Sequence, residues 1–348
     1  MARQLSKYIS LLLTLICMTA CHDTEEYADS PEGNFEALWS ILDEHYCFFS
    51  YKNVDWDEVH ARYRAIVKPG MTREQLFDVL SDMLAELRDG HVNLSSSFAT
   101  SYYKKWWSDY PQNFSLRLIQ QSYFNFDYRQ SSGLMYGMLT DNVGYIYIGS
   151  FSSPIGEGNL DSALSYLQTA SALVIDVRDN GGGQLTSVET VVARFIKEPT
   201  LVGYISHKTG PGHDDFSEPY PIVYKPAGEG RVRWGKPVLV LANRSTFSAA
   251  NNFVSIMKTL PGVTIGGAVT GGGSGMPYSS ELPCGWSVRF SACSILDAEG
   301  NSTENGITPT PGFEAEMDPQ AALDGHDTLL DKTVARLLMQ GLERAQPL

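Results

Sequence analysis

Residues 172–183, ALVIDVRDNGGG, join an apolar run to a polar turn and three consecutive glycines. The run is almost continuously apolar and rich in β-branched residues, which predicts a strand covered on both faces of a parallel sheet. Residues 185–196, LTSVETVVARFI, follow with apolar residues at helical spacing. This stretch therefore predicts a strand–loop–helix unit of an α/β fold.

The same order of elements recurs on either side of this unit. Residues 143–151, VGYIYIGSF, predict a strand, and residues 160–170, LDSALSYLQTA, predict a helix. Residues 237–242, PVLVLA, and 248–260, SAANNFVSIMKTL, repeat the pattern further along. Repeated units of this kind predict an α/β core with substantial parallel pairing.

The chain upstream of this core has helical periodicity. Residues 34–94 contain apolar positions recurring every three or four residues, which predicts a small N-terminal helical subdomain. Thr72 and Gln75 have the spacing of a capping box at the start of one helix. Gly90 can end that helix in the left-handed conformation. We expect residues 95–348 to form the core.

Composition excludes some classes of function. The 348 residues are 43% hydrophobic and carry a formal net charge of −14. An acidic protein repels phosphates, so nucleic-acid binding is not expected. No paired metal-ligand spacing occurs in the sequence, and no metal or other cofactor is expected.

Residues 1–20 have the pattern of a secretory signal peptide. Arg3 and Lys7 precede the apolar run YISLLLTLIC, residues 8–17. A run of this length is too short to cross a hydrocarbon core of about 30 Å as a helix.

Cys21 follows small residues in a pattern that resembles a bacterial lipobox. We expect Cys21 to carry the lipid that anchors the mature chain to the membrane. Residues 21–33 are acidic and polar, which predicts a disordered tether. The expected location is the bacterial cell envelope, as an outer-membrane lipoprotein facing the periplasm or the exterior.

The glycines of DVRDNGGG, residues 176–183, permit three interpretations. Backbone N–H groups at the carboxyl end of a strand can bind a phosphate or hold an oxyanion, and the glycines can also be a turn required by packing. The segment lacks the lysine of a phosphate loop and the spacing of a dinucleotide fingerprint.

Three hydroxyl residues crowd the turn in NRSTFSAANNF, residues 243–253. Ser248 stands where the turn enters a helix, so free N–H groups and the helix dipole favour an attacking oxygen there. Serine is also a preferred N-cap. Ser245 or Thr246 could cap the helix and leave Ser248 for another role.

These two central motifs, with LRDGHVNL at 87–94 and ENGITPTP at 304–311, occur in the order seen in a known family. Together they resemble the C-terminal processing peptidase and tricorn-core family of serine peptidases, over residues 35–345. The resemblance implies a crotonase-like (ClpP/crotonase) α/β spiral core, a peptide or protein substrate, and Ser248 as the nucleophile.

The family divides over its general base. One branch uses a lysine downstream of the serine, but residues 259–331 contain no lysine, and Lys258 lies on the helix of Ser248 itself. The tricorn-like branch uses a histidine and a glutamate, whose positions match His91 and Glu304. Histidine suits the task because its ordinary pKa lies near neutrality.

The resemblance also implies supporting groups. The oxyanion hole would use the backbone N–H of Ala249 with that of Gly181 or Gly182. Gly90 departs from the tricorn-like pattern, in which a side chain before the histidine helps to orient the imidazole. Glu304 would then bridge to His91, through a hydroxyl or water.

Two further features concern substrate recognition. Too few residues separate 87–94 from 143–151 for the PDZ domain that many relatives carry, so none is expected. The aromatic segment 102–128 either lines the substrate cleft or covers the sheet.

Two rival functions share the expected fold. The first is a non-catalytic protein that binds peptides or apolar ligands, which Gly90 would favour. The second is an acyl-CoA enzyme, against which the secretory leader argues. Convergence of the Ser248 and His91 side chains within about 4 Å would favour the peptidase over the binding protein.

Overall fold

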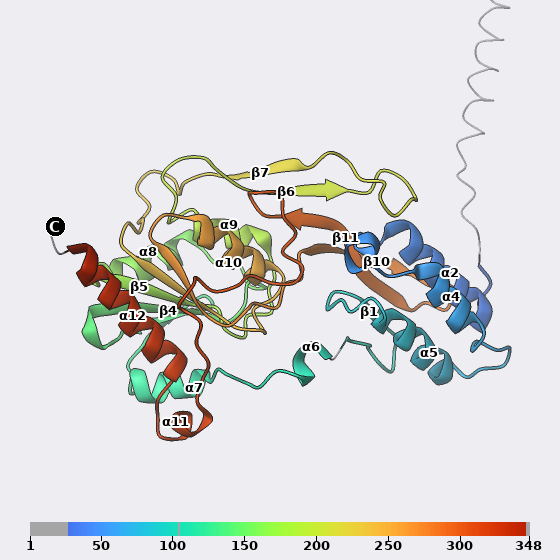
Figure 1. The fold of residues 1–348 in the computed structure, drawn as a ribbon, viewed down its shortest axis with the longest axis horizontal. Coiled ribbons are helices and arrows are strands. Elements are labelled where there is room, and N and C mark those ends of the chain that lie inside the picture. Colours follow the sequence, from blue (N-terminus) through green and yellow to red (C-terminus); the bar gives the residue numbers. More distant parts are fainter. Residues whose placement is uncertain (1–26, 104, 346–348) are drawn as a thin grey trace, which may run out of the picture.

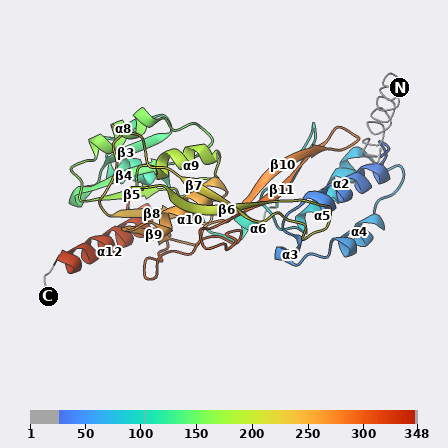
Figure 2. The ribbon, with the colours of Figure 1, turned by 90° about the horizontal axis from the view of Figure 1, so that it is seen from above.

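The structure, a computed structural model, describes residues 27–345 except residue 104. Two units lie at opposite ends of an elongated molecule, and long strands run between them (Figures 1 and 2). We call them the sheet unit and the helical unit.

The sheet unit is built on a six-stranded sheet in the order β2-β3-β4-β5-β8-β9. Strands β4, β5, β8 and β9 are parallel, and β2 and β3 add an antiparallel edge. The strands are β2 (Arg129–Ser131), β3 (Leu134–Met138), β4 (Val143–Ile148), β5 (Ala172–Asp176), β8 (Val238–Ala242) and β9 (Val263–Gly267). Every residue of β5 is buried, which confirms the prediction of a strand covered on both faces.

Helices cover both faces of this sheet. Helices α8 (Glu157–Tyr166), α9 (Leu185–Val192) and α10 (Ala249–Thr259) follow β4, β5 and β8 in turn, as the sequence predicts. Helix α12 (Thr328–Ala345) contacts β8 and β9. The aromatic segment covers the sheet on this side, since Phe114 and Phe124 share a core with Leu329 and Leu330 of α12. This segment contains the short elements α6 (Lys105–Ser108), α7 (Leu116–Leu118) and η1 (Ile119–Tyr123).

The helical unit contains α2 (Pro31–His45), α3 (Phe49–Lys52), α4 (Trp56–Arg64) and α5 (Arg73–Ala85). The capping box at Thr72 and Gln75 is present and starts α5, as predicted. The end of α5 differs from the prediction: Arg88, not Gly90, adopts a positive φ, of 48°.

The predicted tether of residues 21–33 extends too far along the chain. Helix α2 begins at Pro31, because Ser30 caps it by accepting a hydrogen bond from the Gly33 N–H and proline suits the first helical turn. Residues 1–26, including the predicted signal peptide and Cys21, lie outside the described residues.

A second sheet joins the two units. Its path is β1-β11-β6-β7, and β10 pairs with β11. The strands are β1 (Asn93–Ser95), β6 (Thr200–His207), β7 (Tyr220–Tyr224), β10 (Gly275–Glu281) and β11 (Ser287–Leu296). Strands β6 and β7 form an antiparallel hairpin over residues 200–224.

The hairpin of β10 and β11 completes the core of the helical unit. Trp286, Val288 and Phe290 are buried together with side chains of α2 and α5. The predicted boundary at residue 94 therefore does not separate two cores along the chain. Alternation of apolar residues shows that a hairpin forms but not which core it joins.

Candidate active site

Ser248 lies at the start of α10 with φ 56° and ψ −124°. A positive φ is rare for serine and costs free energy, so such a residue persists only where its surroundings hold it. Here the Ser248 N–H donates to the Gly272 carbonyl at 2.8 Å. The Ser248 side chain forms no capping hydrogen bond, which leaves its hydroxyl free for another partner.

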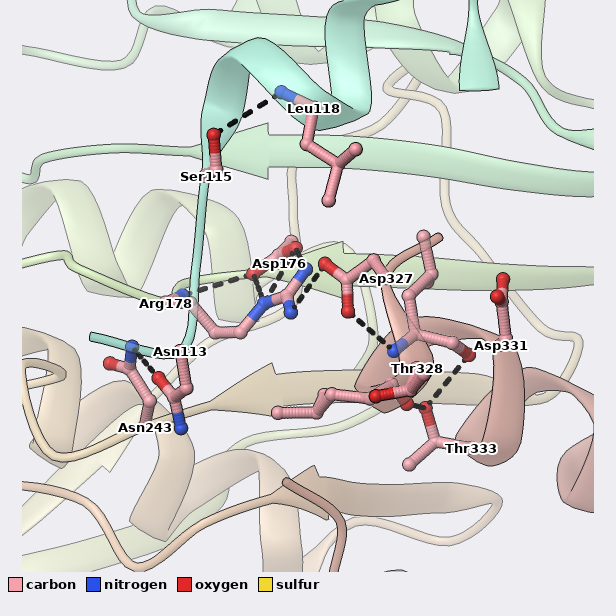
Figure 3. Close-up of polar contacts among 12 residues, drawn as sticks. Asn113, Ser115, Leu118, Asp176, Arg178, Asn243, Asp327, Thr328, Asp331 and Thr333 are labelled. Carbon is pink, nitrogen blue, oxygen red and sulfur yellow. Dashed lines mark hydrogen bonds and ion pairs between the residues drawn. The ribbon is translucent and has the colours of Figure 1, made fainter. Parts of the chain in front are cut away.

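The Thr246 hydroxyl of this turn has a structural task. The Thr246 hydroxyl donates to the Val177 carbonyl at 2.8 Å and accepts from the Asn243 N–H at 3.0 Å. The Asn243 amide donates to Oδ1 of Asn113 at 2.8 Å, as Figure 3 shows. Neither Ser245 nor Thr246 caps α10. Thr246 instead fixes the Ser248 turn to the loop after β5.

His91 is the partner of the Ser248 hydroxyl. Its Nε2 lies 2.9 Å from Oγ of Ser248, although the two residues are 157 positions apart. The imidazole is 2% exposed, and burial lowers its pKa to about 4. At neutral pH the ring is therefore uncharged and able to accept a proton.

Phe247 occupies the space beside His91. Their ring centroids lie 4.7 Å apart, and a Cβ added to Gly90 would stand 2.9 Å from Cζ of Phe247. Gly90 is thus required by the close approach of this ring. The departure from the tricorn-like pattern has a packing reason.

Asp89 is a buried carboxylate that the sequence reasoning missed. Its Oδ1 accepts the His91 N–H at 2.8 Å, and its Oδ2 accepts hydroxyls of Tyr46 and Ser291, each at 2.9 Å. Burial opposes its ionisation, but the charges of Lys52 and His91 and these hydrogen bonds hold its pKa below the usual value. The sequence signal that could have revealed this residue is an aspartate directly before Gly90 and His91. A buried carboxylate is unfavourable unless it is paired or hydrogen-bonded.

Glu304 reaches the site, but it makes no direct hydrogen bond to His91 in the described structure. Its Oε1 pairs with Lys52 at 2.8 Å, and its Oε2 accepts the Ser274 N–H at 2.8 Å. Nδ1 of His91 is buried without a hydrogen-bond partner. Burial and the charge of Asp89 raise the pKa of Glu304 to about 7.

The two hydroxyls beside Glu304 do not bridge it to His91. The Ser302 hydroxyl accepts the Glu304 N–H at 3.3 Å, and the Thr303 hydroxyl accepts the Asn251 amide at 3.1 Å. No protein group of the described residues therefore bridges Nδ1 of His91 to the Glu304 carboxylate.

The glycine loop after β5 closes over Ser248. Gly182 has φ 100°, and a Cβ there would stand 2.7 Å from Cβ of Ser248. Its N–H donates to Oδ1 of Asn180 at 2.9 Å. Among the hydrogen bonds of the described residues, neither Gly181 nor Ala249 has its N–H so engaged. Of the two predicted glycines, Gly181 is therefore the freer donor.

A buried ion network supports the base of this loop (Figure 3). Arg178 pairs with Asp176 at 2.6 Å and with Asp327, just before α12, at 2.8 Å. All three side chains are shielded from solvent. The network ties the end of β5 to the start of α12 and so limits movement of the glycine loop.

A largely apolar cavity of 410 Å³ opens beside Ser248. Its walls include Leu185, Ala249, Met276, Pro277 and Ile295. No described residue of the aromatic segment 102–128 lines this cavity. The cavity has room for an apolar side chain next to the hydroxyl.

Comparison with known proteins assigns the family. Residues 142–311 match the model of peptidase family S41, and residues 27–85 match that of the tricorn protease C1 domain. A solved structure of a candidate peptidase from Parabacteroides merdae ATCC 43184 is 48% identical, with a TM-score of 0.84; the match covers 89% of this chain and 98% of that one. This chain belongs to peptidase family S41. The predicted resemblance is confirmed.

Two further proteins resemble this chain at lower identity. The chain is 28% identical over 199 residues to the carboxy-terminal processing protease CtpA of Bacillus subtilis (strain 168), which covers 56% of this chain and 39% of CtpA. The chain thus spans well under half the length of this curated relative. Mature CPAF has a similar fold, with a TM-score of 0.66 at 13% identity over 89% of this chain and 99% of that one.

Proposed function

We propose that this S41 chain is an envelope-anchored serine peptidase that hydrolyses peptide bonds through an acyl-enzyme on Ser248. The observation that carries the proposal is the 2.9 Å contact between the Ser248 hydroxyl and Nε2 of His91. A nucleophile within hydrogen-bond reach of a neutral imidazole is the arrangement that covalent hydrolysis needs. The crotonase-like spiral that the resemblance implies is part of the proposal.

In the first step, Oγ of Ser248 attacks the peptide carbonyl and His91 takes its proton. The backbone N–H groups of Ala249 and Gly181 hold the developing oxyanion, aided by the positive end of α10. His91 then returns the proton to the leaving amine. Water, activated by the same imidazole, hydrolyses the acyl-enzyme and frees Ser248.

Two carboxylates support the imidazolium that forms during these steps. Asp89 fixes the backbone of His91 and places a negative charge near its ring. Glu304 would act through a water at Nδ1, the buried nitrogen that has no protein partner. Such a water needs polar partners, and the two groups supply them.

The cavity beside Ser248 supports a preference for apolar substrate side chains at the cleaved bond. Met276 and Ile295 would contact such a side chain, and none of the described residues that line the cavity is charged. CtpA is named for carboxy-terminal processing, and we propose either that mode of cleavage or endopeptidase cleavage here.

Anchoring rests on the lipobox-like sequence at Cys21, which lies outside the described residues. Among residues 27–345, apart from 104, no helix combines the length and apolar character needed to cross a bilayer. Mass spectrometry of the N-terminal peptide from bacterial membranes would show a diacylated Cys21 if the proposal holds, and an unmodified terminus if it does not.

A fluorophosphonate probe tests the nucleophile. We expect it to label the wild-type chain on Ser248, and to leave Ser248→Ala unlabelled at equal folding. A peptide library digested by the two proteins then reports the activity and the position of cleavage. Equal labelling or equal digestion by Ser248→Ala would exclude the acyl-enzyme. If the chain is instead a binding protein on the same fold, the peptides would stay intact, and their binding would raise its thermal unfolding temperature.

A further inference from the structure

Lys52 is a lysine largely withdrawn from solvent at the last position of α3, with a side chain only 9% exposed. Its ammonium donates to the Arg88 carbonyl at 3.0 Å and pairs with Glu304 at 2.8 Å. It also lies 3.9 Å from Oδ2 of Asp89. Burying an ammonium is expensive unless partners of this kind compensate it. The contacts put its charge between the two carboxylates that serve His91.

The loop that carries Glu304 is bonded to α3 at a second point. The Asn305 amide donates to the hydroxyl of Tyr51 at 3.1 Å, next to the ion pair of Lys52 and Glu304. The arginine before Asp89 returns a hydrogen bond to the Lys52 carbonyl at 3.1 Å. Helix α3 is therefore bonded both to the loop that carries Asp89 and to the loop that carries Glu304.

We propose that Lys52 is a positioning residue that keeps Glu304 a carboxylate and holds it at the His91–Ser248 pair. The proposal rests on the proposed peptidase function and adds to it a group from the helical unit. Lys52 does not contact Ser248, so it is not the lysine base of the other family branch. Lys258, on α10, bonds instead to Thr308 at 2.8 Å.

The charges around Glu304 give the expected pH effect its sign. Burial and Asp89 raise its pKa, and Lys52 lowers it, with a result of about 7. Without Lys52 the pKa of Glu304 must rise further, so the carboxylate is lost at a higher pH. Lys52 and Arg289 also lower the pKa of His91, and Asp89 raises it. The Tyr46 and Cys47 side chains near Asp89 stay protonated because burial raises their pKa values.

The test compares full-length wild type with Lys52→Met, which keeps length without charge, and with Lys52→Arg, which keeps charge. The measurement is the rate constant for fluorophosphonate labelling of Ser248 between pH 5 and 9. We expect the acidic limb of the Lys52→Met profile to lie about one unit higher, with about tenfold slower labelling below that limb. Lys52→Arg should keep the wild-type limb.

A Glu304→Gln background provides the control. Its profile should lack the limb near neutral pH, and adding Lys52→Met should then leave the profile near neutral pH unchanged, because the titration of His91 lies lower, at about 4. A Lys52→Met limb that coincides with wild type, or a uniform slowing at every pH, would overturn the proposal. If Lys52→Met does not fold, a wild-type limb retained in Glu304→Gln overturns it equally. Absence of wild-type labelling at every pH would instead reject the peptidase function itself.

Discussion

Ser248 combines a strained backbone with a hydroxyl that does not cap its helix. A non-glycine residue in this region of φ and ψ costs on the order of 1–3 kcal/mol. The strain is held by the Gly272 carbonyl behind the residue and by the Thr246 anchor before it. In return, Oγ points to His91 instead of to the N–H groups of α10. In the proposed mechanism, the Ala249 N–H then binds the oxyanion.

At the residue scale, Gly90→Ala should damage the site by filling space. The new Cβ would press on the Phe247 ring, which contacts His91, so we expect kcat to fall at least tenfold and stability to fall by about 1–3 kcal/mol. Gly158→Ala is the matched control, because nothing lies within 4 Å of its Cβ and it sits in α8. Gly158→Ala should leave kcat unaltered and increase the free energy of unfolding by about 0.5–1 kcal/mol.

Peptide hydrolysis and urea unfolding of both variants check this prediction. Wild-type kcat in Gly90→Ala would show that the ring can move away without disturbing His91, and the packing explanation for Gly90 would then be wrong.

At the scale of elements, the β10–β11 hairpin contacts both the core of the helical unit and the active site. Its Trp286 packs edge-on against Phe77 of α5, with ring centroids 5.5 Å apart. Ser291, further along β11, donates its hydroxyl to Asp89. Packing of the hairpin against α5 therefore also sets the position of the carboxylate behind His91.

Trp286→Ala should destabilise the protein by about 3–5 kcal/mol, because the indole is 3% exposed and leaves a cavity. Tyr278→Ala, on the exposed side of β10, should change stability by less than about 0.5 kcal/mol, since its ring is 63% exposed. Urea unfolding followed by circular dichroism measures both. Similar costs for the two variants would contradict the assignment of this hairpin to the core of the helical unit.

At the scale of the whole molecule, the site lies where the two units meet. Ser248 and the glycine loop come from the sheet unit, whereas His91, Asp89 and Lys52 come from the helical unit. Strands β6 and β11 connect the units, as Figure 2 shows. The distance between the nucleophile and its base therefore depends on how the two units are held together.

The interleaving of the units predicts how fragments behave. Residues 27–95 alone lack Leu282, Trp286, Val288 and Phe290 of their core, so we expect no cooperative thermal transition by circular dichroism. The same fragment joined by a short linker to residues 275–296 should regain one. A cooperative transition of residues 27–95 by themselves would show that the boundary at 94 marks an independent domain after all.

Local pattern alone determined most elements of this protein. The buried run of β5, the three helices that follow parallel strands and the capping box of α5 could all be predicted, because each depends on side-chain periodicity over neighbouring residues. The start of α2 was also written in the sequence, in Ser30 and Pro31, although the tether prediction overlooked it.

The family motifs indicated Ser248, His91 and Glu304, and only the tertiary structure decided how they relate. It brought His91 to Ser248, paired Glu304 with Lys52, and placed Asp89 at the backbone N–H of His91. A buried charge is stable only beside a partner of opposite charge or a hydrogen-bonding group. Which group becomes that partner depends on which loops lie close together once the cores have packed. The spacing of apolar residues along the chain does not predict such contacts between distant loops.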